Sequence, residues 1–139
     1  MLAAFARVAR IARRPGGNGQ AGTEYLLAAR RAASFVRDHL WDQESEMLRR
    51  RFRDGHAEVE AYAEDYACLI FGLIELFQTD PDPQWLTWAV QLQRRQDELF
   101  WDEGGGGWFS TTGRDPSVLV RMKDDYRSEE RRVGKECRL

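Results

Sequence analysis

The chain has 139 residues, 42% of them hydrophobic and 32% charged, with a formal net charge of −2. This length allows one small domain, and this charge excludes the broad basic field typical of nucleic-acid binding. No apolar run approaches the roughly 20 residues that cross a membrane. The two cysteines, Cys68 and Cys137, show neither zinc-site spacing nor a disulfide framework. We therefore expect a cytoplasmic protein with no metal, no cofactor, no nucleic-acid partner and no membrane partner.

Apolar spacing predicts two helices near the N-terminus. Residues 2–14 place apolar side chains on one side and arginines on the other with a helical period. Pro15 and the glycine that follows it end this pattern. A second helix is predicted over residues 24–40, with Thr23 as its N-cap.

The middle of the chain combines one extended segment with two further predicted helices. Residues 47–52 are expected to be extended, and Arg53-Asp54-Gly55 is a turn signal. The third predicted helix, over residues 58–78, is apolar nearly all round in its second half, which is typical of a helix buried on most sides. A fourth helix is predicted over residues 83–100, because proline is tolerated in a first helical turn. Four glycines, Gly104 to Gly107, follow it.

Two parts of the chain resemble each other at a constant offset of roughly 60 residues. The matched pairs are Tyr25-Leu26 with Trp85-Leu86, Ala29 with Ala89, Leu40 with Phe100, Trp41 with Trp101, and Asp42 with Asp102. A repeated unit of two helices and a long loop predicts stacked helical hairpins. Helix 58–78 would lie inside, with helices 24–40 and 83–100 outside. We therefore predict an all-α fold that forms part of an α/α toroid and is truncated at both ends.

The last residues of the chain have no periodicity and match nothing before them. Back-translation of residues 127–137 yields, at every codon, the ligation adapter used in short-read DNA sequencing. We therefore expect a domain fragment over residues 1–126 and a non-native tail over residues 127–139. On this interpretation Cys137 carries no function.

Three stretches carry a family resemblance: Tyr62 to Ala67, Leu99 to Gly106 with Trp108-Phe109, and Val120 to Tyr126. Through them, residues 1–126 resemble the helical portion of the thioredoxin domain-containing proteins related to spermatogenesis-associated protein 20. Met122 departs from the family, in which proline is usual at this position. The resemblance implies an N-terminal thioredoxin-like domain followed by a barrel of six helical hairpins, similar to sugar epimerases and six-hairpin glycosidases. That domain and the remaining hairpins would be partners of this segment within one parent chain.

Candidate ligand-binding residues gather at the head of the predicted third helix. Tyr62 and Tyr66 lie four residues apart on one face, and an aromatic platform beside a carboxylate suits a sugar ring. Glu64 and Asp65 are adjacent and point about 100° apart, so they do not form a glycosidase pair with each other, and catalytic residues stay unassigned. The helix dipole alone also favours carboxylates here. His56 has the acid/base chemistry of a sugar epimerase, although an exposed histidine without a role is the simpler interpretation.

Three further candidates lie near the C-terminal end of the resemblance. Phe109 either returns to the core or faces a ligand, and Arg121 with Lys123 forms a small basic pair suited to an acidic group of a ligand or to solvent. The sequence thus predicts a partial carbohydrate-active or sugar-binding domain that is inactive as a fragment. The alternatives are a non-catalytic interaction scaffold attached to a thioredoxin-like redox domain, and a self-contained small helical binding protein.

Overall fold

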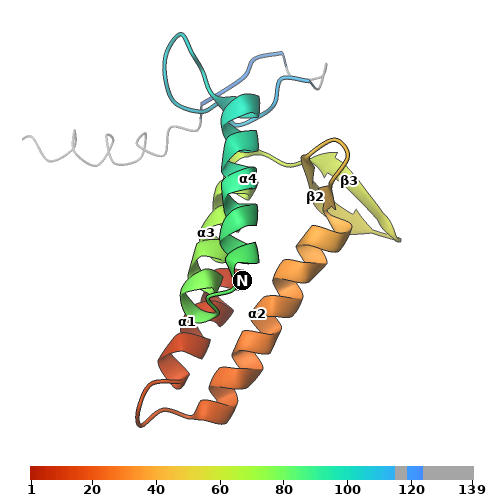
Figure 1. Ribbon diagram of the computed structural model, residues 1–139. Coiled ribbons are helices and arrows are strands. Elements are labelled where there is room, and N and C mark those ends of the chain that lie inside the picture. The colour runs from red at the N-terminus through yellow and green to blue at the C-terminus, as the bar shows by residue number, and fades with distance from the viewer. Residues whose placement is uncertain (115–118, 124–139) are drawn as a thin grey trace, which may run out of the picture.

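A computed structural model describes residues 1–114 and 119–123 of the chain. The elements in chain order are α1 (Leu2–Ala12), α2 (Gly19–His39), β1 (Trp41–Asp42), β2 (Met47–Arg53), β3 (His56–Glu60), α3 (Ala63–Thr79) and α4 (Pro83–Phe100). In Figure 1 the sheet lies at the C-terminal end of α2, beside α3 and α4. Within the described ranges, no helix is both long enough and apolar enough to cross a bilayer. The predicted tail over residues 127–139 lies outside the described residues, as do the last three residues of the third resemblance stretch.

The sheet shows that the predicted all-α fold is wrong. The strands β1, β2 and β3 form one antiparallel sheet in chain order. The chain turns between β2 and β3 at Asp54 and Gly55, whose φ angles of 51° and 82° are those of a two-residue hairpin turn. Residues 58–60 pair with β2 instead of starting the third helix, so α3 begins only at Ala63. The fold is mixed α/β, and this strand content does not fit the predicted helical toroid.

The start of α2 also differs from the prediction. Asn18 is the N-cap, and its side chain accepts a hydrogen bond from the Ala21 backbone N–H at 3.1 Å. Thr23 lies inside the helix and donates its hydroxyl to the Gly19 carbonyl. Asparagine is at least as good an N-cap as threonine. Helix α2 therefore begins at Gly19, more than one turn before the predicted start at residue 24. The predicted bounds of the fourth helix, in contrast, are confirmed by α4.

Helix α3 packs against α1 on one side and α4 on the other. The contact with α1 is close at Gly72, where an added Cβ would lie 2.8 Å from Cδ2 of Leu2. Beside it, Glu75 is 6% exposed and accepts hydrogen bonds from Arg7 and Arg10 at 2.9 and 3.0 Å. A small residue therefore sets the spacing of the two helices, and a carboxylate on α3 holds α1 in place.

A second buried carboxylate joins α2 to the turn between α3 and α4. Asp80 accepts two hydrogen bonds from Arg30 of α2, at 2.7 and 2.6 Å, and one from the indole N–H of Trp85 at 3.0 Å. Such forked arginine–carboxylate contacts fix orientation as well as distance. Asp80 thus determines where α2 lies relative to α3 and α4.

The expectation that the second half of the third helix is buried on most sides is confirmed, because it packs against both α1 and α4. One stripe of α3 is exposed, with Phe71 and Ile74 at 47% and 38%. A second apolar stripe is exposed on α1, where Val8 and Ile11 are 40% and 60% exposed. Both stripes lie outside because the core of the described residues uses the side of α1 that faces α3 and the sides of α3 that face α1 and α4.

The internal repeat forms the same local turn twice, once after α2 and once after α4. Trp41 pairs with Leu48, and Trp101 forms an isolated bridge with Trp108, so each tryptophan pairs with the residue seven positions later. The side chains of Asp42 and Asp102 each accept a hydrogen bond from the backbone N–H two residues on, at 3.0 Å in both cases. The repeated sequence therefore encodes a repeated local turn.

The buried carboxylates predict how stability depends on pH. Hydrogen bonds from Arg7 and Arg30 hold the pKa values of Glu75 and Asp80 below their ordinary values of 4.5 and 3.8. Carboxylates with lowered pKa values stabilise the folded state above the ordinary pKa, and this stability is lost as the pH falls through the folded-state value. We expect the free energy of unfolding from urea titrations to decrease below pH 4.5.

A variant of Glu75 separates this effect from general acid denaturation. Glu75→Gln should lower the free energy of unfolding at pH 7 by about 1 kcal/mol and flatten its decline at acid pH. The exposed Glu103→Gln serves as the control. An unchanged acid limb in Glu75→Gln would show that the contact with α1 does not govern the pH response.

Candidate functional site

The predicted ligand-binding residues lie mainly where α3 begins and α4 ends. The loop after α4 crosses this region, because the Ser110 carbonyl accepts a hydrogen bond from the Ala63 N–H at 3.0 Å (Figure 1). The Ser110 N–H donates to the Met122 carbonyl at 2.8 Å, and the Thr112 hydroxyl donates to Glu60 at 2.7 Å. Residues from β3, α3 and the loop are therefore held together at one end of the molecule.

Three predicted residues meet around an arginine that the sequence analysis did not select. The guanidinium carbon of Arg50 lies 4.3 Å from the ring centroid of Tyr62. Its nitrogens lie 3.2 Å from Glu64 and 3.5 Å from Asp65. Asp65 also accepts a hydrogen bond from the Tyr62 N–H at 2.9 Å, which caps α3. We call Arg50, Tyr62, Glu64 and Asp65 the Arg50 group.

Tyr66 does not join Tyr62 in an aromatic platform. It is fully buried, and its ring packs edge-on against Phe100 at 5.6 Å. Its hydroxyl accepts a hydrogen bond from the Leu48 N–H at 2.8 Å, and burial raises the pKa of this hydroxyl. Tyr62 precedes the first helical residue, so the helical spacing on which the platform depended does not hold. Tyr66 supports the sheet from inside the core.

The remaining predicted cations form a second group, around Phe109. Arg121 and Lys123 lie 4.2 and 5.2 Å from the Phe109 ring centroid. Arg121 donates hydrogen bonds to the carbonyls of Leu99 and Thr111, and Lys123 donates to the Gly106 carbonyl and pairs with Asp102 at 2.6 Å. The hydrogen bond from Lys123 lowers the pKa of Asp102. Both cations therefore hold the glycine-rich loop against the end of α4.

His56 lies away from these two groups. It is the first residue of β3, next to the exposed turn of the β2–β3 hairpin. The neighbouring Glu58 forms an ion pair with Arg51 across the strands, and the hydrogen bond from Arg51 lowers the pKa of Glu58.

Within the described residues, no group of three His, Cys, Asp or Glu side chains is placed to hold a metal ion. The carboxylates with lowered pKa values here suit ion pairing, whereas a catalytic acid must retain its proton.

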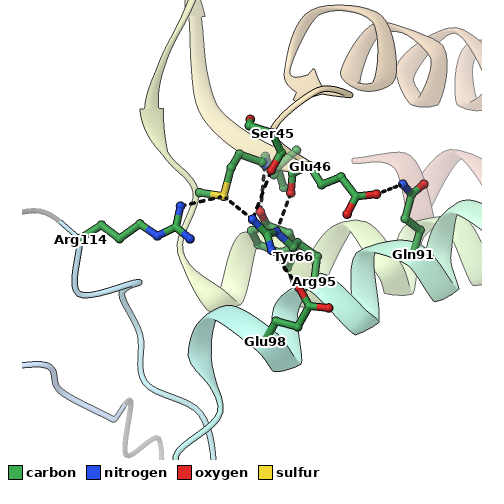
Figure 2. A network of polar contacts seen from close by, with 9 residues as sticks. Ser45, Glu46, Tyr66, Gln91, Arg95, Glu98 and Arg114 are labelled. Carbon is green, nitrogen blue, oxygen red and sulfur yellow. Dashed lines mark hydrogen bonds and ion pairs between the residues drawn. The ribbon is translucent and has the colours of Figure 1, made fainter.

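The contacts that fix the turn between β1 and β2 on α4 could not be predicted from the sequence. Arg95 donates to the carbonyls of Ser45 and Glu46 at 3.2 and 3.0 Å and pairs with Glu98 at 2.8 Å (Figure 2). Gln91 donates to the Glu46 carboxylate at 2.8 Å. Figure 2 shows these side chains converging from α4 on the turn. A polar stretch of α4 whose partners lie about 50 residues earlier in the chain gives no local signal.

The sequence of this chain is similar to one segment of several longer animal proteins. No family model matches the chain. Mouse spermatogenesis-associated protein 20 is 38% identical over 114 residues, which cover 75% of this chain and 14% of the mouse protein. The chain is homologous to one segment of spermatogenesis-associated protein 20. The human protein is 36% identical over 106 residues, and an uncharacterised Caenorhabditis elegans protein is 34% identical over 110 residues.

The homology confirms the resemblance only for the segment that it covers. The chain spans 14% of the mouse and human proteins and 15% of the Caenorhabditis elegans protein. The thioredoxin-like domain and the glycosidase-like character stay predictions.

The hydrogen bond between the Leu48 N–H and the buried Tyr66 hydroxyl can be tested by substitution. Tyr66→Phe leaves the buried Leu48 N–H without its acceptor, so we expect the free energy of unfolding to fall by about 1–3 kcal/mol in urea titrations. Tyr25→Phe, on the exposed side of α2, should change it by less than about 0.5 kcal/mol. Equal stability of both variants would show that the hydrogen bond to β2 does not hold the sheet in place.

Proposed function

We propose that this segment binds carbohydrate and contributes no catalytic acid–base pair of its own. The proposal rests on the Arg50 group, in which a tyrosine that is 37% exposed stands beside one guanidinium and two carboxylates. A sugar ring presents an apolar face, which suits an aromatic ring, and hydroxyls, which exchange hydrogen bonds with charged planar groups.

Binding fits this geometry better than cleavage. A glycosidase places two carboxyl groups on either side of the scissile bond, about 5–9.5 Å apart. Glu64 and Asp65 instead share the Arg50 guanidinium, and Asp65 also caps α3. The group is thus suited to recognising hydroxyls, and any catalytic pair would include residues of the longer parent protein.

Removal of the Tyr62 ring should weaken sugar binding. We expect saturation-transfer NMR with a panel of neutral mono- and oligosaccharides to detect binding, and Tyr62→Ala to weaken it about fivefold, because a stacking contact is worth roughly 1 kcal/mol. Tyr25→Ala is the matched control, since Tyr25 is 40% exposed and lies on α2, outside the Arg50 group. A panel that produces no signal with the unaltered chain would contradict the proposal.

An interaction scaffold is the second candidate, favoured by the exposed apolar stripes of α1 and α3. Val8, Ile11, Phe71 and Ile74 are between 38% and 60% exposed. Patches of this kind mark interfaces or cause association. In this alternative the segment offers packing surfaces to partners of a thioredoxin-like redox domain in the longer protein.

Self-association through these apolar stripes can be measured directly. We expect the chain to self-associate in light scattering coupled to size-exclusion chromatography, and Ile11→Glu with Ile74→Glu to shift it toward monomer, since buried charge disfavours apolar contacts. Gln20→Glu with Thr87→Glu adds the same two charges at exposed polar positions outside the stripes and is the control. A monodisperse monomer with sharp, cooperative thermal unfolding would count against adhesive stripes.

A further inference from the structure

Helix α1 carries two rows of side chains that lie outside the hydrophobic core. The first row is apolar and exposed, and consists of Ala4, Val8 and Ile11. The second row is basic and consists of Arg7, Arg10 and Arg14. Neighbours within each row are three or four residues apart, so each row follows one face of the helix. We call the surface formed by these two rows the α1 face.

The α1 face continues onto α3 through Arg7. The guanidinium carbon of Arg7 lies 5.0 Å from the ring centroid of Phe71, the first residue of the exposed α3 stripe. The two helices run in the same direction, because Leu2 lies beside Gly72 and Arg10 donates a hydrogen bond to Gln78. Exposed apolar side chains at helical spacing on neighbouring helices are the anchors against which an amphipathic helix packs.

The charge of the α1 face is positive. Residues 1–14 contain four arginines and no aspartate or glutamate, although the whole chain has a formal net charge of −2. Arg7 and Arg10 share the single carboxylate of Glu75, and their side chains remain 52% and 33% exposed. A partner that matches this face must therefore present carboxylates next to apolar side chains, as an acidic amphipathic helix does.

The same charge disfavours a second copy of this chain as the occupant. Two α1 faces in contact would place arginines opposite arginines, and like charges across an interface oppose binding. A membrane surface also fits less well than a helix. The larger apolar side chains of α1, Leu2 and Phe5, pack against the core, so they are not free to enter a bilayer.

We propose that the α1 face, together with the exposed stripe of α3, docks an acidic amphipathic helix of a partner protein. Apolar side chains of that helix would cover the apolar row and Phe71, and its carboxylates would pair with the arginine row. This partner belongs to the interaction scaffold described above, on which the proposal rests. The α1 face shares no residue with the Arg50 group, so carbohydrate binding is decided separately.

The test measures the binding of two fluorescently labelled helical peptides to the full chain by fluorescence anisotropy. Both peptides have about 18 residues, roughly five turns, with leucines at helical spacing. One carries glutamates beside the leucines, and the other carries lysines at the same positions. The acidic peptide should bind at least about tenfold more tightly. Raising the NaCl concentration from about 0.05 to 0.5 M should weaken its binding, because salt screens exposed ion pairs.

Substitutions at exposed positions locate the contact. Ile11→Ser with Arg14→Gln changes one member of each row and should weaken binding of the acidic peptide about tenfold. Leu27→Ser with Arg31→Gln makes the same changes on α2 and should leave binding unchanged. Because all four positions are exposed, both variants should keep the circular dichroism of the unaltered chain.

Other results overturn the proposal in ways that can be told apart. Equal affinity for both peptides, or an equal loss in both variants, removes the acidic helix and leaves the scaffold candidate standing. Preference for vesicles that contain phosphatidylserine, lost in Ile11→Ser with Arg14→Gln, assigns the face to a membrane surface. Self-association that strengthens with salt while neither peptide binds assigns the face to a second copy. A monodisperse monomer that binds neither peptide overturns the scaffold candidate as well.

Discussion

The hydrogen bond to the hydroxyl of Tyr66 is the contact on which the placement of β2 and the Arg50 group depends. This hydroxyl lies in the core between α3 and α4. It accepts a hydrogen bond from the backbone N–H of Leu48, the second residue of β2. Two residues before Leu48 is the turn residue Glu46, and two residues after it is Arg50. One buried hydrogen bond therefore positions the turn that Arg95 holds and the centre of the Arg50 group. An internal N–H in apolar surroundings needs an acceptor, which makes this position costly to change.

Helices α1 and α2 are held by ion pairs between buried carboxylates and arginines whose side chains are partly exposed. Glu75 and Asp80 are 6% and 9% exposed, whereas the side chains of Arg7 and Arg30 are 52% and 46% exposed. Long arginine stems allow the charge to stay hydrated while the fork reaches a buried acceptor. Helix α1 and helix α2 are thus attached to α3 by contacts that retain part of their hydration. This leaves the outer stripes of α1 and α3 open for other contacts.

Local patterns in the sequence predicted elements well where local chemistry decides the structure. The periodicity of α1 and α4 and the Asp54-Gly55 turn needed no knowledge of distant residues. Strand β3 was missed because its residues run into the helical pattern of α3, although Glu58 and Glu60 face Arg51 and Arg49 across the strands. Val59 has a φ of 62°, which is rare for a β-branched residue and has no sequence signature. The all-α prediction failed at this hairpin.

The candidate sites show the same division between local and distant contacts. Tyr62, Glu64 and Asp65 lie together because they are neighbours in sequence, but Arg50 joins them only through the hairpin. The two repeated turns, at Trp41 and Trp101, also differ in their distant contacts. Trp41 and Trp101 share the same pairing geometry, yet Trp41 is 7% exposed and lines a cleft with Trp88, whereas Trp101 packs against Trp108 and is 45% exposed. A repeat therefore specifies the turn, while the element packed against it determines whether that turn can contribute to a binding site.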